Sequence, residues 1–123
     1  MIINELNDFI KDYFETLQGQ DLALFDKVFN SSCVLYSQQD GATIVRPFAE
    51  YRLIVQGRKS PREGGYPFHD EVLMIDVLSP TMAMIKVRLR LFDNIMEDQL
   101  NVMKTENGWQ IFAKHFYRVG SAN

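Results

Sequence analysis

The chain has 123 residues, of which 46% are apolar and 12% aromatic, which suits one hydrophobic core rather than several domains. Its net charge of −3 lacks the basic excess of nucleic-acid-binding proteins. No apolar stretch has the length of a transmembrane helix or a secretory signal. We therefore expect a single domain over residues 1–123 that binds neither nucleic acid nor membranes. A cytoplasmic location is expected, because the only cysteine, Cys33, cannot form an intramolecular disulfide.

Residue types that bind metals are scarce in this chain. Besides the one cysteine there are two histidines, His69 and His115, which lie far apart in sequence. Zinc sites are built from several such ligands at close spacing. We therefore expect no metal site, and nothing in the sequence indicates a cofactor.

Three amphipathic segments in the first half of the chain predict helices. Residues 2–17 repeat apolar side chains with the 3.6-residue period of a helix, and Gly19 follows where a left-handed cap ends one. Asp21 is a typical N-cap residue in front of a second, short helix. Pro47 suits the first position of a third helix, which is expected to end at Gly57.

Strands are expected between and after these helices. Residues 33–37 predict a short strand, and residues 41–45 a turn with a second short strand. The polar, Gly/Pro-rich residues 58–67 predict a mobile loop. Residues 70–119 predict an antiparallel meander, because alternating apolar positions are separated by turn-forming residues. Helices followed by a curved sheet predict a cone-shaped α+β domain.

Two tight turns, at residues 79–81 and 93–94, set the expected strand pairing in the meander. They predict cross-strand pairs of Ile75 with Ile85, Leu89 with Asp98, and Arg90 with Glu97. Because side chains alternate along a strand, the apolar positions define one inner face. The same alternation in the last strand points His115 and Tyr117 inward.

The outer face of the expected sheet is also apolar, where a solvent-facing strand is normally polar. The side chains concerned are Met74, Met84, Met103, Phe112 and Phe116. An apolar patch on the back of a sheet is typical of a partner surface, unless another segment of the chain covers it. Since no segment is left to cover it, we predict a homodimer packed sheet to sheet.

The order helix, helix, strand, helix and long meander resembles the nuclear transport factor 2-like superfamily over essentially the whole chain. Three segments carry the resemblance: YFETLQGQDLALFDKVF from Tyr13, IDVLSPTMAMIKVRLRL from Ile75 and DQLNVMKTENGWQIFAKHFYRV from Asp98. The last two are similar to the branch described as putative lumazine-binding, close to the SnoaL-like proteins. The resemblance implies N-terminal helices packed in the concave face of a curved antiparallel sheet. It leaves the activity open, because one fold hosts many functions.

The ketosteroid isomerases of this superfamily give a sharper comparison. Their oxyanion-hole tyrosine matches Tyr13, whereas their catalytic base falls on Ser37 and their protonated aspartate on Leu100. Serine without an activating neighbour is a poor base at neutral pH, and leucine donates no hydrogen bond. The resemblance therefore argues against isomerisation by that mechanism.

A carboxylate in the apolar interior defines the candidate site. Asp98 is expected to project inward beside His115 or Tyr117, with Tyr13 on the covering helix. An Asp–His pair can charge an imidazole for acid–base catalysis while a tyrosine polarises a carbonyl. The candidate catalytic residues are therefore Asp98, His115 and Tyr13. The candidate pocket-lining residues are Tyr13, Ser37, Tyr51, Ile54, Leu100, His115 and Tyr117.

Simpler roles explain the same residues. Asp98 can be a solvated residue at the rim of the cone, and His115 a hydrogen-bonded core residue. The basic side chains from Arg46 to Arg62 suit a solvated loop, or else the mouth of a pocket for an anionic ligand. Three functions stay open. They are a small-molecule-binding protein with an apolar, aromatic-lined pocket and an unidentified ligand, a cofactor-independent isomerase, dehydratase or cyclase, and a non-catalytic dimeric interaction module.

Overall fold

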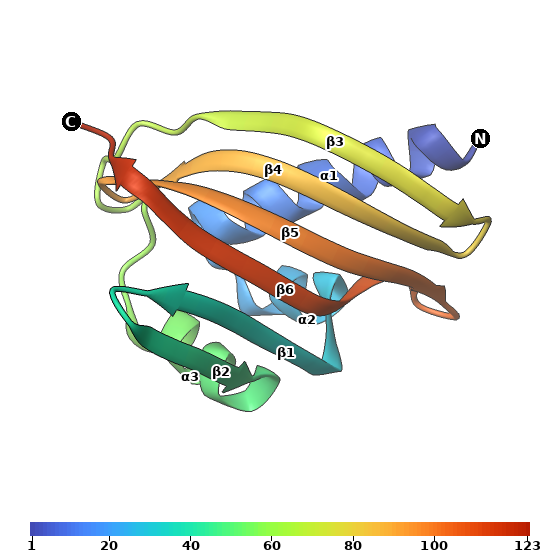
Figure 1. Ribbon diagram of the computed structural model, residues 1–123, viewed down its shortest axis with the longest axis horizontal. Coiled ribbons are helices and arrows are strands. Elements are labelled where there is room, and N and C mark those ends of the chain that lie inside the picture. Colours follow the sequence, from blue (N-terminus) through green and yellow to red (C-terminus); the bar gives the residue numbers. More distant parts are fainter.

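Three helices cover the concave face of a six-stranded sheet in the computed structural model, which describes residues 1–123 (Figure 1). The helices are α1 (Ile2–Gly19), α2 (Leu22–Val28) and α3 (Phe48–Gly57). The strands are β1 (Phe29–Gln39), β2 (Ala42–Pro47), β3 (Asp70–Ser79), β4 (Met82–Leu91), β5 (Asn94–Thr105) and β6 (Gly108–Ser121). A core of 21 buried apolar residues joins the helices to the sheet. The predicted α+β class is confirmed.

Local sequence signals explain the ends of the helices. Asp21 caps α2, since its Oδ1 accepts hydrogen bonds from the backbone N–H groups of Ala23 and Leu24 at 2.8 and 3.2 Å. Pro47 immediately precedes α3. The left-handed cap of α1 is Gln20, with φ 53°, one residue beyond the glycine expected there. None of the three helices combines the length and apolar character that crossing a membrane requires.

The sheet has the strand order β2-β1-β6-β5-β4-β3. All neighbouring strands are antiparallel except β1 and β6, which are parallel. The predicted meander corresponds to β3 to β6, and β1 and β2 extend it on the β6 side. As Figure 1 shows, the long strands curve together in front of α1, while α3 lies behind β1 and β2. The concave face is therefore enclosed by α3 at its β1–β2 end.

The first two of the three β-hairpins of the meander differ in how well their registers were predicted. The first has the expected pairing across β3 and β4. The second is shifted by two residues, so that Arg88 rather than Arg90 lies opposite Glu97. The shift arises because the two-residue turn is Phe92-Asp93, one position earlier than predicted. Each side chain of this hairpin still keeps its predicted face, because a shift of two preserves the alternation.

A β-bulge in β6 decides which side chains reach the concave face. Ile111 lies opposite Val102, and Ala113 lies opposite the adjacent Asn101. Phe112 is therefore an extra residue on β6 with no partner on β5. An inserted residue reverses the facing of every side chain beyond it.

The bulge corrects the predicted orientation of the last strand. The side chains that face inward beyond it are Lys114, Phe116 and Arg118. His115 and Tyr117 are exposed on the other face, so their predicted inward placement is wrong. Phe116, predicted to face outward, lies opposite Asp98 and faces the interior instead. The predicted pairing of Asp98 with His115 or Tyr117 is therefore wrong as well.

Candidate functional site

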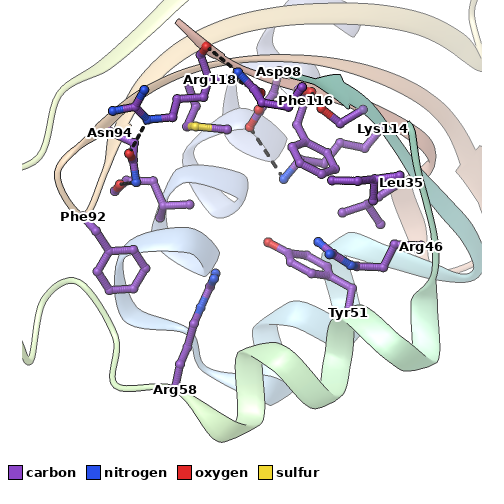
Figure 2. Close-up of a pocket in the computed structure, with 15 residues that line it drawn as sticks. Leu35, Arg46, Tyr51, Arg58, Phe92, Asn94, Asp98, Lys114, Phe116 and Arg118 are labelled. Carbon is purple, nitrogen blue, oxygen red and sulfur yellow. Dashed lines mark hydrogen bonds and ion pairs between the residues drawn. The ribbon is translucent and has the colours of Figure 1, made fainter. Parts of the chain in front are cut away.

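A cavity of about 340 Å³ lies between the concave face of the sheet and α3 (Figure 2). Five strands, α3 and the β4–β5 turn contribute to its walls. The lining residues are Leu35, Ser37, Gln39, Ile44, Arg46, Tyr51, Arg58, Leu91, Phe92, Asn94, Met96, Asp98, Lys114, Phe116 and Arg118. Pockets for small molecules have volumes of roughly 300–1,000 Å³. The cavity is therefore large enough for a compact organic ligand.

Asp98 lies at the deep end of this cavity and is 3% exposed. The hydroxyl of Tyr13 donates a hydrogen bond to its Oδ2 at 2.5 Å, and the Nζ of Lys114 lies 3.6 Å from the same oxygen. Carboxylates are buried at tolerable cost only when they are paired and hydrogen-bonded, as here. Asp98 is thus a buried, paired carboxylate and not a solvated residue at the rim.

Aromatic rings surround the ammonium group of Lys114. Its Nζ lies 5.3 Å from the ring centroids of both Tyr13 and Tyr51, and 5.8 Å from that of Phe29. Such distances allow cation–π attraction. Burial alone lowers the pKa of this ammonium, but the charge of Asp98, with smaller contributions from other neighbours, outweighs burial and raises the pKa above its usual value. Lys114 is therefore charged at neutral pH.

The hydroxyl group of Tyr13 is occupied by its hydrogen bond to Asp98. Burial first, and then the nearby charge of Asp98, raise the pKa of the Tyr13 hydroxyl well above its usual value, so it remains a protonated donor. Tyr13 does not line the cavity, and its hydroxyl is not free to polarise a substrate carbonyl. With His115 on the outer face, the expected grouping of Asp98, His115 and Tyr13 does not form.

The charged residues that line the cavity are Arg46, Arg58, Lys114, Arg118 and Asp98. The negative charge of Asp98 is paired with the ammonium group of Lys114. The Nε of Arg46 lies 3.5 Å from an oxygen of the exposed Glu50, and the Nε of Arg118 donates to the neutral Asn94 at 2.7 Å. Positive charge therefore exceeds negative charge on the cavity wall.

Arg58, directly after α3, is held by neutral groups. Its Nε donates to the side-chain oxygen of Gln20 at 2.9 Å, and its guanidinium lies 5.2 Å from the ring centroid of Phe92. Phe92 has φ 57°, which non-glycine residues rarely adopt, and its ring packs edge-on against Tyr66. The loop predicted to be a mobile, solvated segment thus begins with a side chain that lines the cavity.

The predicted pocket-lining residues divide between the cavity and other sites. Ser37 and Tyr51 line the cavity, and Ser37 donates from Oγ to the carbonyl oxygen of Phe116 at 2.5 Å. The others lie elsewhere, with Tyr13 and Leu100 in the core, Ile54 packed against it from α3, and His115 and Tyr117 on the outer face. No three His, Cys, Asp or Glu side chains are grouped as metal ligands.

Sequence reasoning missed the cationic residues of β6. Simple alternation counts Lys114 and Arg118 as outward-facing, and only recognition of the bulge reverses them. Phe112 carries no glycine or other local signal that marks a bulge, so the sequence alone offered no warning. For the basic side chains from Arg46 to Arg62 the sequence left open a solvated loop and a pocket mouth, and Arg46 and Arg58 line the cavity.

A sequence-family model described as “Putative lumazine-binding” matches residues 2–117. The chain belongs to this family. No curated protein matches the chain, whereas many solved structures do. One is an NTF2-like protein of unknown function from Shewanella baltica, with TM-score 0.81 and 16% identity over 97% of this chain and 94% of that chain.

Two further solved structures show the same fold. An NTF-2 like protein of unknown function from Silicibacter pomeroyi has TM-score 0.78 and 15% identity over 94% of both chains. A ketosteroid isomerase-like protein from Erwinia carotovora atroseptica has TM-score 0.67 and 10% identity over 93% of both chains. At these identities the likeness shows the NTF2-like fold and nothing about the reaction or ligand.

The buried ion pair predicts a large effect of Asp98→Asn on stability. The amide still accepts from Tyr13 but leaves the Lys114 ammonium buried without a counter-charge. Removal of one partner from a buried pair costs about 3–5 kcal/mol, and urea unfolding should show a loss of this order. The matched control is Asp12→Asn, which breaks an exposed 3.0 Å pair with Lys27 and should cost less than about 1 kcal/mol. Equally small losses in both variants would contradict a desolvated pair.

The raised pKa values predict loss of stability in alkali. Lys114 and Tyr13 both hold their protons more tightly in the folded protein than in the unfolded chain. Their contribution is complete below about pH 10 and is lost as the pH rises through the folded-state values. The free energy of unfolding, measured by urea titration at several pH values, should therefore decline above about pH 10. The decline should be shallower in the double variant Lys114→Met, Tyr13→Phe. An unchanged slope would show that other groups cause the decline.

Proposed function

We propose that the protein binds a small molecule in the cavity between the sheet and α3. The observation that carries this proposal is a preformed cavity whose polar groups are only partly satisfied by the protein. The Nη2 of Arg58 is buried and has no hydrogen-bond partner. Such groups are usually satisfied in native proteins, so an unsatisfied one on a cavity wall supports a ligand. The cytoplasm is the proposed compartment, because the one cysteine is free.

The walls of the cavity favour a flat ligand. The rings of Tyr51, Phe92 and Phe116 line it together with aliphatic side chains. Aromatic faces bind planar molecules by stacking, while a few polar groups set the orientation. The description of the family supports lumazine, a planar bicyclic heterocycle, as the first compound to test.

Two other functions considered from the sequence receive less support. The hypothesis of an isomerase, dehydratase or cyclase required Asp98, His115 and Tyr13 to act together. His115 faces outward and Tyr13 is hydrogen-bonded to Asp98, so this hypothesis receives no support. A purely structural module would have its interior filled by its own side chains, whereas this interior holds a cavity. Binding of a small molecule is therefore the function that the geometry supports best.

Blocking the cavity should weaken binding of lumazine. Ile44 and Val45 are neighbours on β2, but Ile44 lines the cavity and Val45 is 59% exposed on the opposite face. Ile44→Trp should fill the cavity and reduce lumazine affinity by at least about tenfold, an effect typical of losing a well-packed contact. Val45→Trp adds the same side chain outside the cavity and should bind as the unmodified protein does.

Isothermal titration calorimetry of the two variants tests this directly. Equal affinity of Ile44→Trp and Val45→Trp for lumazine would show that binding occurs outside the cavity. Circular dichroism and thermal unfolding of both variants control for folding, and β2 is an edge strand on which a larger side chain can be accommodated.

We also propose a homodimer that forms through the outer face of the sheet. Apolar side chains line a hollow of about 320 Å³ there, and they include Leu78, Met84, Met103 and Phe112. Met74 is 45% exposed and belongs to the same face, whereas Phe116 is removed from the proposed interface because it faces the cavity. Exposed apolar surface of this kind is typical of a protein interface, and a second copy offers a self-complementary partner.

A charge on the outer face should prevent this association. Met103→Glu is expected to give a monomer in sedimentation equilibrium, because the carboxylate would be buried without a partner in the dimer. Leu53→Glu is the control, since Leu53 is 68% exposed on α3, away from the sheet face. A monomeric unmodified protein at high concentration would contradict the proposed interface.

A further inference from the structure

The positive charges of the cavity have no sufficient counter-charge in the protein. Four cationic side chains line the cavity with a single carboxylate, Asp98, which is already paired with Lys114. Cations that share a low-dielectric wall repel one another and focus a positive potential into the space between them. A neutral ligand would leave this repulsion in place, whereas an anionic ligand would relieve it.

Arg58 presents a fixed and unused hydrogen-bond donor. Its guanidinium is positioned by Gln20 and by the ring of Phe92, yet its Nη2 has no partner. Figure 2 shows the guanidinium rising from the end of α3 toward the cavity. Guanidinium groups bind carboxylate and phosphate oxygens with two parallel hydrogen bonds, and a group already held in place loses little entropy on binding.

Lys114 presents unused donors from the opposite wall. An ammonium group has three donors, and the contact of Lys114 with Asp98 at 3.6 Å is too long for a strong hydrogen bond. Figure 2 shows its nitrogen directed into the cavity, on the side facing Arg58. Lys114 and Arg58 are both cationic and line the same cavity, so their charges repel each other.

Arg46 adds a third donor on the β2 side. Its Nε is buried and has no hydrogen-bond partner, since Glu50 lies only within ion-pair distance at 3.5 Å. The guanidinium carbon lies 6.0 Å from the ring centroid of Phe116, another lining residue. Three cationic side chains with unused donors thus converge on one cavity, each from a different element.

We propose that the ligand carries an oxyanion, a carboxylate or a phosphate, bound between Arg58, Arg46 and Lys114, with its flat body against Tyr51 and Phe116. This inference rests on the proposed small-molecule function and specifies the chemical class of the ligand. Asp98 does not oppose the anion, because its charge is neutralised by Lys114 and its Oδ2 accepts from Tyr13. The ion pair instead holds the ammonium in position.

Three probes that share one flat ring system test the charge requirement. We would titrate 2-naphthoate, 2-naphthyl phosphate and the neutral 2-naphthamide into the full chain by isothermal titration calorimetry, alongside lumazine. At least one anionic probe should bind about tenfold or more tightly than the amide, as expected for a charged hydrogen bond. Arg58→Gln should remove this preference, and Arg46→Gln should weaken it.

Lys59→Gln is the matched control, because Lys59 is the next residue, carries the same charge and is exposed outside the cavity. It should leave the preference unchanged. A tighter complex with naphthoate assigns a carboxylate ligand, and a tighter complex with naphthyl phosphate assigns a phosphate. Equal affinity for all three naphthyl probes, unaffected by Arg58→Gln, would overturn the proposal that the ligand carries an oxyanion. The proposed small-molecule function would still stand. Absence of binding by all four compounds would overturn both.

Discussion

The ion pair between Asp98 and Lys114 makes the concave face of this sheet polar at its deepest point. Charged groups at this depth strongly destabilise a protein unless they are paired and hydrogen-bonded. Tyr13 on α1 supplies the hydrogen bond, and Tyr51 on α3 contributes a ring beside the ammonium. The positions of both helices and the charge state of the cavity are therefore coupled. A change that moves either helix leaves a buried charge less well satisfied.

The bulge in β6 makes this ion pair possible. With uninterrupted alternation, Lys114 would face solvent and His115 the interior. The single extra residue, Phe112, reverses the faces on which Lys114 and His115 lie. Lys114 therefore lies in the apolar interior, opposite Leu100. The same insertion leaves Phe112 in the apolar hollow on the outer face. One local irregularity thus determines both the chemistry of the cavity and the composition of the surface behind it.

Much of the fold could be predicted from the sequence, because it depends on local signals. Apolar periodicity marked the helices, turn residues marked the first hairpin, and the inward direction of Asp98 followed from strand alternation and is matched by its burial. The remaining features depend on contacts distant in sequence. Phe92 has the positive φ of a two-residue turn, and its ring packs against Tyr66 and Arg58, contacts that no neighbouring residue signals. The bulge at Phe112 and the parallel pairing of β1 with β6 are likewise products of tertiary packing.

A charged lysine, held by Asp98, lies inside the cavity. The most direct test is nitrogen NMR of protein labelled with ¹⁵N-lysine, with Lys114→Met used to assign the signal. A buried ammonium should give a slowly exchanging NH₃⁺ signal at neutral pH that persists up to about pH 10. A Lys114 signal that changes to that of a neutral amine near or below neutral pH, as documented for buried lysines without a partner, would show that Asp98 does not hold the charge of Lys114.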